Sequence, residues 1–282
     1  MRKGLLFILV LVLTAGLTAC GAKPDIPASS SSGSSSGNST KDSTTQGNTL
    51  DAIKKAGKIT IAVDDTFPPM EFRNDKNELV GFDVDLAKAI TKQIGVEANF
   101  VPTAWDGILP GLDAKKYDVI MSSMNITDER KQKVNFAEYL KLGQIVVVKA
   151  GNPKGIKSVQ DLKGKVVGVQ MGTTSETAVR KIAGIKDIKT YNGYTDAFND
   201  MGLGRLDAIV AAEAVGRYYM KTKPGVYEVV GDTFQSLPVG IAVRKGDKDL
   251  LDALNKAVEE VKKNGEYAKV SKQWFGTDKS NE

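Results

Sequence analysis

The stretch 81-GFDVDLAKAITKQIGVEANFVP-102 joins a helix to the strand that follows it. Its apolar residues between 82 and 90 fall mostly on one helical stripe, which predicts an amphipathic helix over 81–95. KITIAV (58–63) before it and EANFVP (97–102) after the helix are typical of strands. A helix at 105–116 and a strand at 117–123 continue the alternation. This β-α-β-α-β order predicts an α/β fold with a parallel sheet and helices on its faces.

The same alternation begins again near residue 144, with strands expected at 144–150, 165–170, 187–192 and 207–212. A last strand (239–246) and two helices follow this second unit, and we expect them to return to the first. Two hinge crossings then join two lobes, and a ligand cleft lies between them at the carboxyl ends of both sheets. The expected parts are a first lobe of 51–141 with 237–282, and a second lobe of 142–236 that includes the hinge segments.

The first twenty residues have the pattern of a signal peptide. A basic MRK precedes the apolar GLLFILVLVLTAGL, which is too short for a membrane-spanning helix, and LTAC closes the segment. LTAC resembles the bacterial lipobox, in which the cysteine thiol receives a diacylglyceryl group and becomes the first residue after cleavage. We therefore expect a signal peptide at 1–19 and a lipidated, acyl-chain-bearing Cys20. The alternative is an uncleaved anchor with an unmodified cysteine.

Residues 21–49 consist mainly of Ser, Gly and Thr and have almost nothing to bury. Such a composition predicts a flexible tether, here assigned to 20–50. A lipid anchor with a tether places the folded part at an extracytoplasmic membrane surface without inserting it.

Composition excludes several kinds of site. The chain has no histidine, and Cys20 is its only cysteine, so a His-based triad, a zinc site and a cysteine nucleophile in the folded part are ruled out. The formal charge is +5, from 39 basic and 34 acidic residues that are interspersed along the chain. This indicates a solvated surface and no nucleic-acid partner. We expect no metal, no cofactor and a monomer.

Polar and aromatic residues follow the expected strands at the cleft edge. In SSMNITDERKQ (122–132), small hydrogen-bonding groups and one arginine stand near a helix start, as a small anion requires. Each residue also has an ordinary alternative: a turn acid, a core aromatic, a surface arginine, or a capping box in TTSE (173–176). Their convergence on one edge favours a site for a small zwitterion, made by Asp64, Phe67, Trp105, Ser122, Ser123, Asn125, Arg130, Met171, Thr173, Thr174 and Glu213.

Several motifs, in order, resemble one known family. DDTFPPMEF…GFDVDLAKAI, SSMNITDERKQKVNF, DLKGKVVGVQMGTT, GRLDAIV and VSKQWFG are similar to the extracellular solute-binding proteins of polar amino-acid ABC importers, family 3 type, over about residues 51–276. The resemblance implies a two-lobed, hinged periplasmic-binding-protein (type II) fold. It also implies a receptor that closes on an amino acid and delivers it to a membrane permease driven by an ATPase.

The resemblance assigns roles by position. Arg130 matches the arginine that pairs with the ligand α-carboxylate, with help from Ser123 or Asn125 and from backbone N–H groups near Thr173 and Thr174. Phe67 and Trp105 match the aromatic walls, on whose faces a cationic group can also lie. Asp64 matches a position that reads the ligand side chain, and a free carboxylate there favours a cationic or amide-bearing one.

One position departs from the family pattern. Ala212 stands where the family usually has the aspartate that binds the α-ammonium, and Glu213 follows it. A buried ammonium needs a partner. Glu213 replaces the aspartate, Asp64 takes the ammonium, or the ligand is unusual; the sequence leaves the three open. FAEYL (136–140) also lacks the proline common before the first crossing.

Two other functions compete with a transport receptor that performs no catalysis. One is a dehydratase-like enzyme on the same fold, with Asp64 or Glu213 as acid or base. The other is an extracellular ligand sensor, which would need a spanning helix or an output domain after residue 276, where only TDKSNE remains. The lipobox and tether favour the transport receptor.

Overall fold

The structure, a computed structural model, describes residues 48–281. The expected signal peptide, Cys20 and nearly all of the expected tether lie outside the described residues. Helix α1 (Thr49–Ala56) begins two residues before the expected start of the first lobe. None of the helices within residues 48–281 has the length and apolar character needed to cross a membrane.

The first lobe is built mainly from the segment before residue 134. Its elements are α1, β1 (Lys58–Val63), β2 (Thr66–Phe67), β3 (Glu71–Arg73), β4 (Leu79–Val80), α2 (Phe82–Ile94), β5 (Glu97–Pro102), α3 (Trp105–Asp113), β6 (Val119–Ile120) and α4 (Asp128–Lys133). The sequence predicted β1, α2, β5, α3 and β6, and a helix start within 122–132, where α4 begins, whereas the short sheet β2-β3-β4 and helix α1 were not predicted.

The second lobe follows the strand β7 (Val134–Lys149). Its elements are the 3₁₀ helix η1 (Val159–Leu162), β8 (Val166–Gln170), α5 (Thr174–Arg180), β9 (Asp187–Tyr191), α6 (Tyr194–Gly202), β10 (Ala208–Ala212) and α7 (Glu213–Thr222). The chain then runs through β11 (Tyr227–Arg244), α8 (Lys248–Lys263) and α9 (Glu266–Phe275). The predicted order of strands and helices in this lobe is confirmed.

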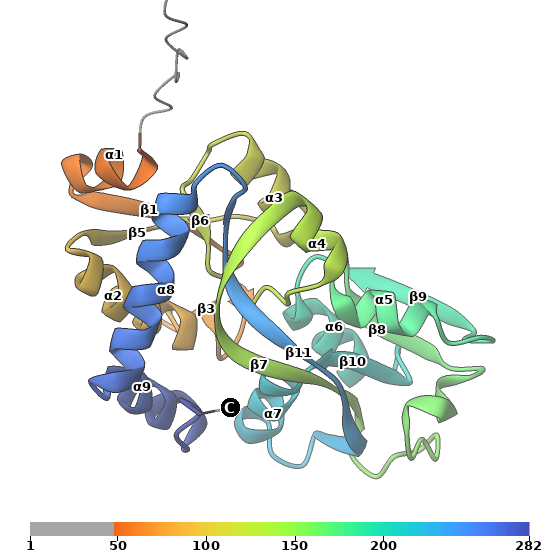
Figure 1. The fold of residues 1–282 in the computed structure, drawn as a ribbon. Helices are drawn as coiled ribbons and strands as arrows, with labels where there is room; N and C mark the ends of the chain where they lie inside the picture. Colours follow the sequence, from red (N-terminus) through yellow and green to blue (C-terminus); the bar gives the residue numbers. More distant parts are fainter. Residues whose placement is uncertain (1–47, 282) are drawn as a thin grey trace, which may run out of the picture. The chain divides into compact units, whose positions relative to one another are not determined.

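One eight-stranded sheet runs through both lobes, in the order β5-β1-β6-β11-β7-β10-β8-β9. Its two central strands, β7 and β11, pair antiparallel along most of their length and pass from one lobe into the other (Figure 1). Strands had been predicted only for the later parts of β7 and β11. The polar residues of KLGQ (141–144) interrupt the apolar pattern, so the sequence did not predict one continuous strand. Backbone pairing with β11 maintains the strand there.

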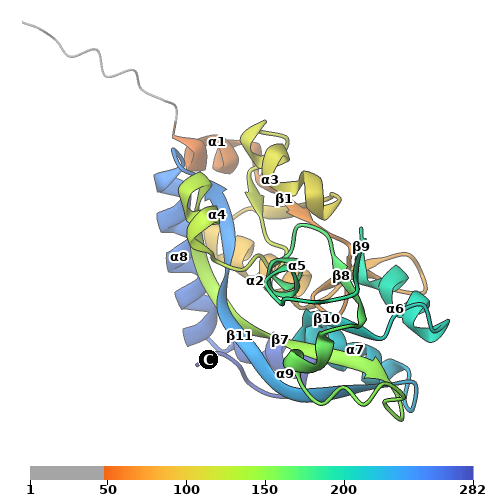
Figure 2. The same cartoon turned by 90° about the vertical axis from the view of Figure 1, so that its right-hand side faces the viewer.

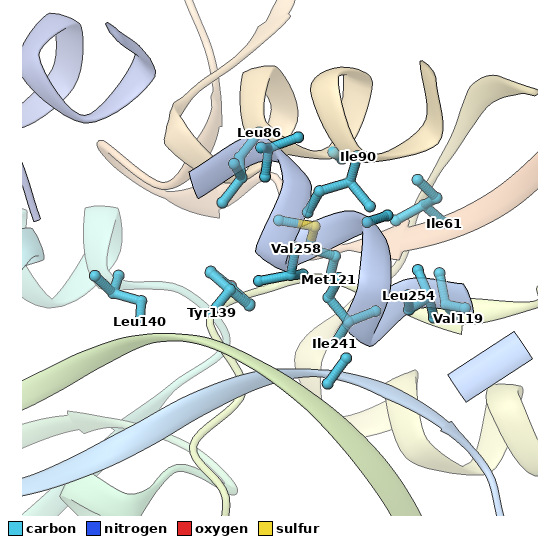
Figure 3. Close-up of a cluster of buried hydrophobic side chains, with 14 of the residues drawn as sticks. Ile61, Leu86, Ile90, Val119, Met121, Tyr139, Leu140, Ile241, Leu254 and Val258 are labelled. Carbon is cyan, nitrogen blue, oxygen red and sulfur yellow. The ribbon is translucent and has the colours of Figure 1, made fainter. Parts of the chain in front are cut away.

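The returning chain completes the core of the first lobe. Strand β11 pairs with β6, and side chains of α8 pack against those of α2 (Figure 3). Leu86 and Ile90 of α2 lie in one buried cluster with Leu254 and Val258 of α8. Strand β11 and helices α8 and α9 thus pack with elements of the first lobe. Two further buried clusters fill the second lobe on either side of its strands. Figure 2 shows the helices and strands of this lobe from a second side.

Helix α2 can begin where it does because residue 81 is a glycine. Gly81 has φ +142°, and a Cβ there would lie 2.1 Å from the carbonyl oxygen of Met70. This close approach lets the backbone N–H of Asp83 donate to Met70 at 2.9 Å. The first turn of α2 is thereby fixed against β3, which places Asp83 below the ligand pocket described next.

Candidate functional site

A pocket lies between the lobes, and residues from both lobes line it. The first lobe and the hinge strand β7 supply one wall, and the ends of β8 and β10 and the starts of α5 and α6 supply the other. The lining residues are Phe67, Trp105, Ser122, Ser123, Asn125, Arg130, Leu142, Gly143, Gln144, Gln170, Thr173, Thr174, Ser175, Tyr194 and Ala212.

Arg130 is held at the pocket by neutral groups. Its guanidinium donates to the carbonyl oxygens of Asn125, at 2.9 Å, and Gly172, at 3.3 Å, and lies 5.3 Å from the Trp105 ring centroid. Burial lowers the pKa of Arg130 to about 10, so the group still carries its charge at neutral pH. None of the ion pairs within residues 48–281 includes Arg130. The pocket therefore contains a partly buried cation that can accept an anionic partner.

The loop that carries Ser122 and Ser123 rests on two buried acids. The Ser122 hydroxyl donates to Glu71 at 2.8 Å. Asp83 accepts from the backbone N–H of Ser123 at 2.7 Å, from its hydroxyl at 3.0 Å, and from Tyr139 at 2.7 Å. These bonds hold Ser123 in the left-handed region, at φ +49°. The acids thus fix the floor of the pocket from below.

Glu71 and Asp83 are completely buried and interact with each other, and one oxygen of each, Glu71 Oε2 and Asp83 Oδ1, has no other hydrogen-bond partner. Two carboxylates can share a hydrogen bond only if one of them holds a proton. Burial raises the pKa of both groups, and the negative charge of Asp83 raises the pKa of Glu71 further, well above its usual range. These shifts favour a proton on Glu71, which can then donate to Asp83.

Direct contacts join the lobes across the pocket. The Gln170 amide donates to Asp64 at 2.5 Å, and the Thr174 hydroxyl donates to Asn125 at 2.8 Å. The Trp105 indole N–H donates to the carbonyl oxygen of Gly172 at 3.1 Å. The structure therefore has the two walls in hydrogen-bonding contact with each other.

The family model for bacterial extracellular solute-binding proteins, family 3, matches residues 59–277. The chain belongs to this family. A curated relative, the L-cystine-binding protein TcyJ of Escherichia coli K12, is 38% identical over 81% of this chain and 86% of its own length. The family resemblance predicted from the sequence is confirmed.

Solved structures of amino-acid-binding proteins are similar to this one in fold. An ancestral arginine-binding protein bound to arginine is 47% identical, with a TM-score of 0.75, over 78% of this chain and 99% of its own. The ancestral amino acid-binding protein AncCDT-1, described as a precursor of cyclohexadienyl dehydratase, is 42% identical, with a TM-score of 0.76, over 80% and 99% of the two chains. The predicted two-lobed α/β fold class is confirmed.

Eight of the eleven expected site residues line this pocket: Phe67, Trp105, Ser122, Ser123, Asn125, Arg130, Thr173 and Thr174. Asp64 lies just behind it, only 3% exposed, with its oxygens accepting from Thr66 and Gln170. Burial raises the pKa of Asp64, and these hydrogen bonds oppose the shift. Met171 lies outside the pocket lining, where its N–H donates to Tyr191.

Glu213 lies away from the pocket. It pairs with Arg217 at 2.6 Å and lines a separate groove beside α9. Ala212 does line the pocket and brings no charge to it. Within residues 48–281 no cluster of acidic, histidine or cysteine side chains is arranged to hold a metal ion.

Sequence reasoning missed the lining residues Leu142, Gly143, Gln144, Gln170, Ser175 and Tyr194. A search of the loops after each strand overlooks Gln170 because it is the last residue of β8 itself. A polar residue that ends a buried apolar strand was the available signal. Gln144 gave the same signal at the start of an apolar run.

The buried acid pair predicts a pH-dependent stability. In the unfolded chain Glu71 titrates near its ordinary pKa of 4.5, so its stabilising contribution is full below that pH and declines as pH rises toward its folded pKa. Glu71→Gln imitates the protonated acid and does not titrate. Urea unfolding at several pH values from 5 to 8 should show the variant gaining on the wild type, by up to about 1.4 kcal/mol per pH unit.

Glu97→Gln is the matched control, because it removes an exposed carboxylate from the sheet edge. Its stability difference from the wild type should stay nearly constant over the same pH range. A Glu71→Gln difference that is equally constant would contradict a protonated Glu71.

Proposed function

We propose that this protein is the amino-acid-binding receptor of an ABC importer, a non-catalytic protein that hands its ligand to a permease and ATPase. One observation carries the proposal: Arg130 presents a half-buried positive charge to the pocket between the lobes and, within residues 48–281, forms no ion pair with a carboxylate. A guanidinium matches a carboxylate with two parallel hydrogen bonds. Membership of family 3 and the binding proteins among its relatives support the same function.

The pocket walls favour a ligand with one polar and one apolar part. The α-carboxylate lies on Arg130, next to Asn125 and Thr174. Phe67 and Tyr194, with ring centroids 5.8 Å apart, and Trp105 enclose the remainder. Relatives named for L-cystine and arginine support an L-amino acid with a long polar side chain.

No observation at the site favours catalysis. Asp64 already accepts from Thr66 and Gln170, and Glu213 pairs with Arg217 outside the pocket. A general acid or base must reach the reacting atoms. We therefore infer binding without turnover; product formation from a bound amino acid would overturn this inference.

The first prediction concerns Arg130. Arg130→Ala should weaken binding of the amino acid that gives the largest thermal shift in a panel of L-amino acids and L-cystine. The expected loss is about 2–5 kcal/mol, as for breaking a buried charge pair. Arg130→Lys should not restore affinity, because the planar two-pronged contact is lost. Calorimetry on both variants measures this.

Arg205→Ala is the control for these variants, since Arg205 is exposed and pairs with Asp200 away from the pocket. Its affinity should equal that of the wild type. Wild-type affinity in Arg130→Ala as well would remove the basis of the proposal.

The second prediction concerns lobe closure. We propose that 51–141 with 237–282 forms one rigid lobe and the middle of the chain the other, with hinges in β7 and β11. A ligand that touches both lobes binds the closed state better and raises its population. Small-angle scattering should show a smaller radius of gyration with saturating ligand; an unchanged radius would argue against a hinged receptor.

The third prediction concerns the anchor. We propose that Cys20 is lipidated and holds the receptor at the extracytoplasmic face of the membrane. In cells fed an alkyne fatty acid, the wild type should be labelled and partition into detergent. Cys20→Ser should lose the label and be released or remain unprocessed. A Ser variant that still labels would show that the lipid is elsewhere.

A further inference from the structure

Two glutamine side chains in the pocket have an acceptor with no donor. Five buried side-chain oxygens within residues 48–281 lack a hydrogen-bond partner: Glu71 Oε2, Asp83 Oδ1, Gln144 Oε1, Gln170 Oε1 and Asp247 Oδ2. The shared proton of the acid pair explains the first two, and Asp247 Oδ2 lies 2.8 Å from the Arg244 guanidinium. The remaining two belong to Gln144 and Gln170, and both residues line the pocket.

The direction of the Gln170 amide is determined by its surroundings. Gln170 is 1% exposed, and its Nε2 donates both to Asp64 Oδ2, at 2.5 Å, and to the carbonyl oxygen of Asn192, at 2.9 Å. Both of these partners are acceptors, so the amide cannot be turned round without placing oxygen against oxygen. Gln170 Oε1 is therefore left as a buried acceptor that requires a donor.

The aspartate that would accept hydrogen bonds from a ligand ammonium, according to the family resemblance, is missing from this pocket. Ala212 offers no carboxylate to an ammonium, Glu213 lies outside the pocket, and both oxygens of Asp64 already accept hydrogen bonds. An ammonium has three donors and no acceptor. A carboxylate behind an amide also polarises it and strengthens its oxygen as an acceptor.

We propose that Gln170 Oε1, oriented by Asp64, accepts a hydrogen bond from the ligand α-ammonium in place of the aspartate that Ala212 replaces. Gln144, 3% exposed, supplies a second amide acceptor. Asp64 acts through Gln170 as a positioning residue. This inference rests on the proposed function and specifies how that site reads the ammonium.

The arrangement couples ammonium recognition to closure. Asp64 follows β1 in the first lobe, and Gln170 ends β8 in the second. Their hydrogen bond crosses the cleft, whereas the bond to Asn192 lies within the second lobe, so both bonds that orient the amide are present only while the lobes are in contact. An ammonium that uses it favours the closed state over the open one.

Matched ligand pairs test the proposal. The pairs are L-arginine with 5-guanidinopentanoic acid, L-glutamine with glutaramic acid, and L-histidine with 3-(imidazol-4-yl)propanoic acid. Each acid lacks only the α-ammonium. For the pair whose amino acid binds the wild type best, Gln170→Met should weaken the amino acid about 10- to 100-fold, as expected for losing a bond to a charged group. The affinity of the deaminated acid should hardly change.

Two further variants keep the test decisive. Gln93→Met, on the exposed side of α2, is the control and should bind both members as the wild type does. Asp64→Ala leaves Gln170 in place but frees its amide, so the preference for the amino acid over its deaminated acid should fall here too. The measurement on Asp64→Ala still tests the proposal if Gln170→Met does not fold.

The outcomes separate the two proposals. Equal weakening of both pair members, or no weakening, overturns the role of Gln170 while Arg130-dependent binding keeps the receptor function. If no L-amino acid or L-cystine binds the wild type, the proposed function fails and this inference fails with it.

Discussion

The pairing of β7 with β11 is the constraint on which the rest of the structure depends. Both strands must carry their backbone hydrogen bonds from one lobe into the other, because buried N–H and C=O groups cannot remain unpaired. The pairing shifts register between Val230 and Gly240, where the strands pass the pocket. A Cβ on Gly143 would lie 2.1 Å from the Thr233 methyl group there. Gly143 thus allows the two strands to remain paired where β7 lines the pocket.

The charged side chains around the pocket are accommodated in three different ways. Arg130 keeps its positive charge at neutral pH, whereas burial of Glu71 favours its neutral, protonated form. Asp64 is retained behind the pocket by hydrogen bonds, and its influence reaches the cavity through the Gln170 amide. Burial makes each solution necessary, since an uncompensated ion is costly away from water.

Local patterns predicted most of the fold because they report local preferences. The stripe of α2 and the apolar run of β1 are visible in a few residues. Arg130 was also predictable, since its motif lies within one short segment. Gln170 was not predictable, because its orientation depends on a hydrogen bond to Asp64, which lies more than a hundred residues away in the sequence. Glu213 failed to reach the pocket because the first turn of α7 directs it toward Arg217.

The chain enters and leaves the folded part through the same lobe. Ile53 of α1 and Val270 of α9 belong to one buried cluster, and the backbone N–H of Leu50 donates a hydrogen bond to the Asp249 carboxylate at the start of α8. The second lobe is therefore inserted between β7 and β11, which are neighbouring strands of the sheet. Its half of the pocket, with Gln170, can diverge in sequence or be exchanged for another version. Such a change leaves the attachment to the rest of the chain intact, while it alters the wall that contains Gln170 and that contacts Arg130 through Gly172.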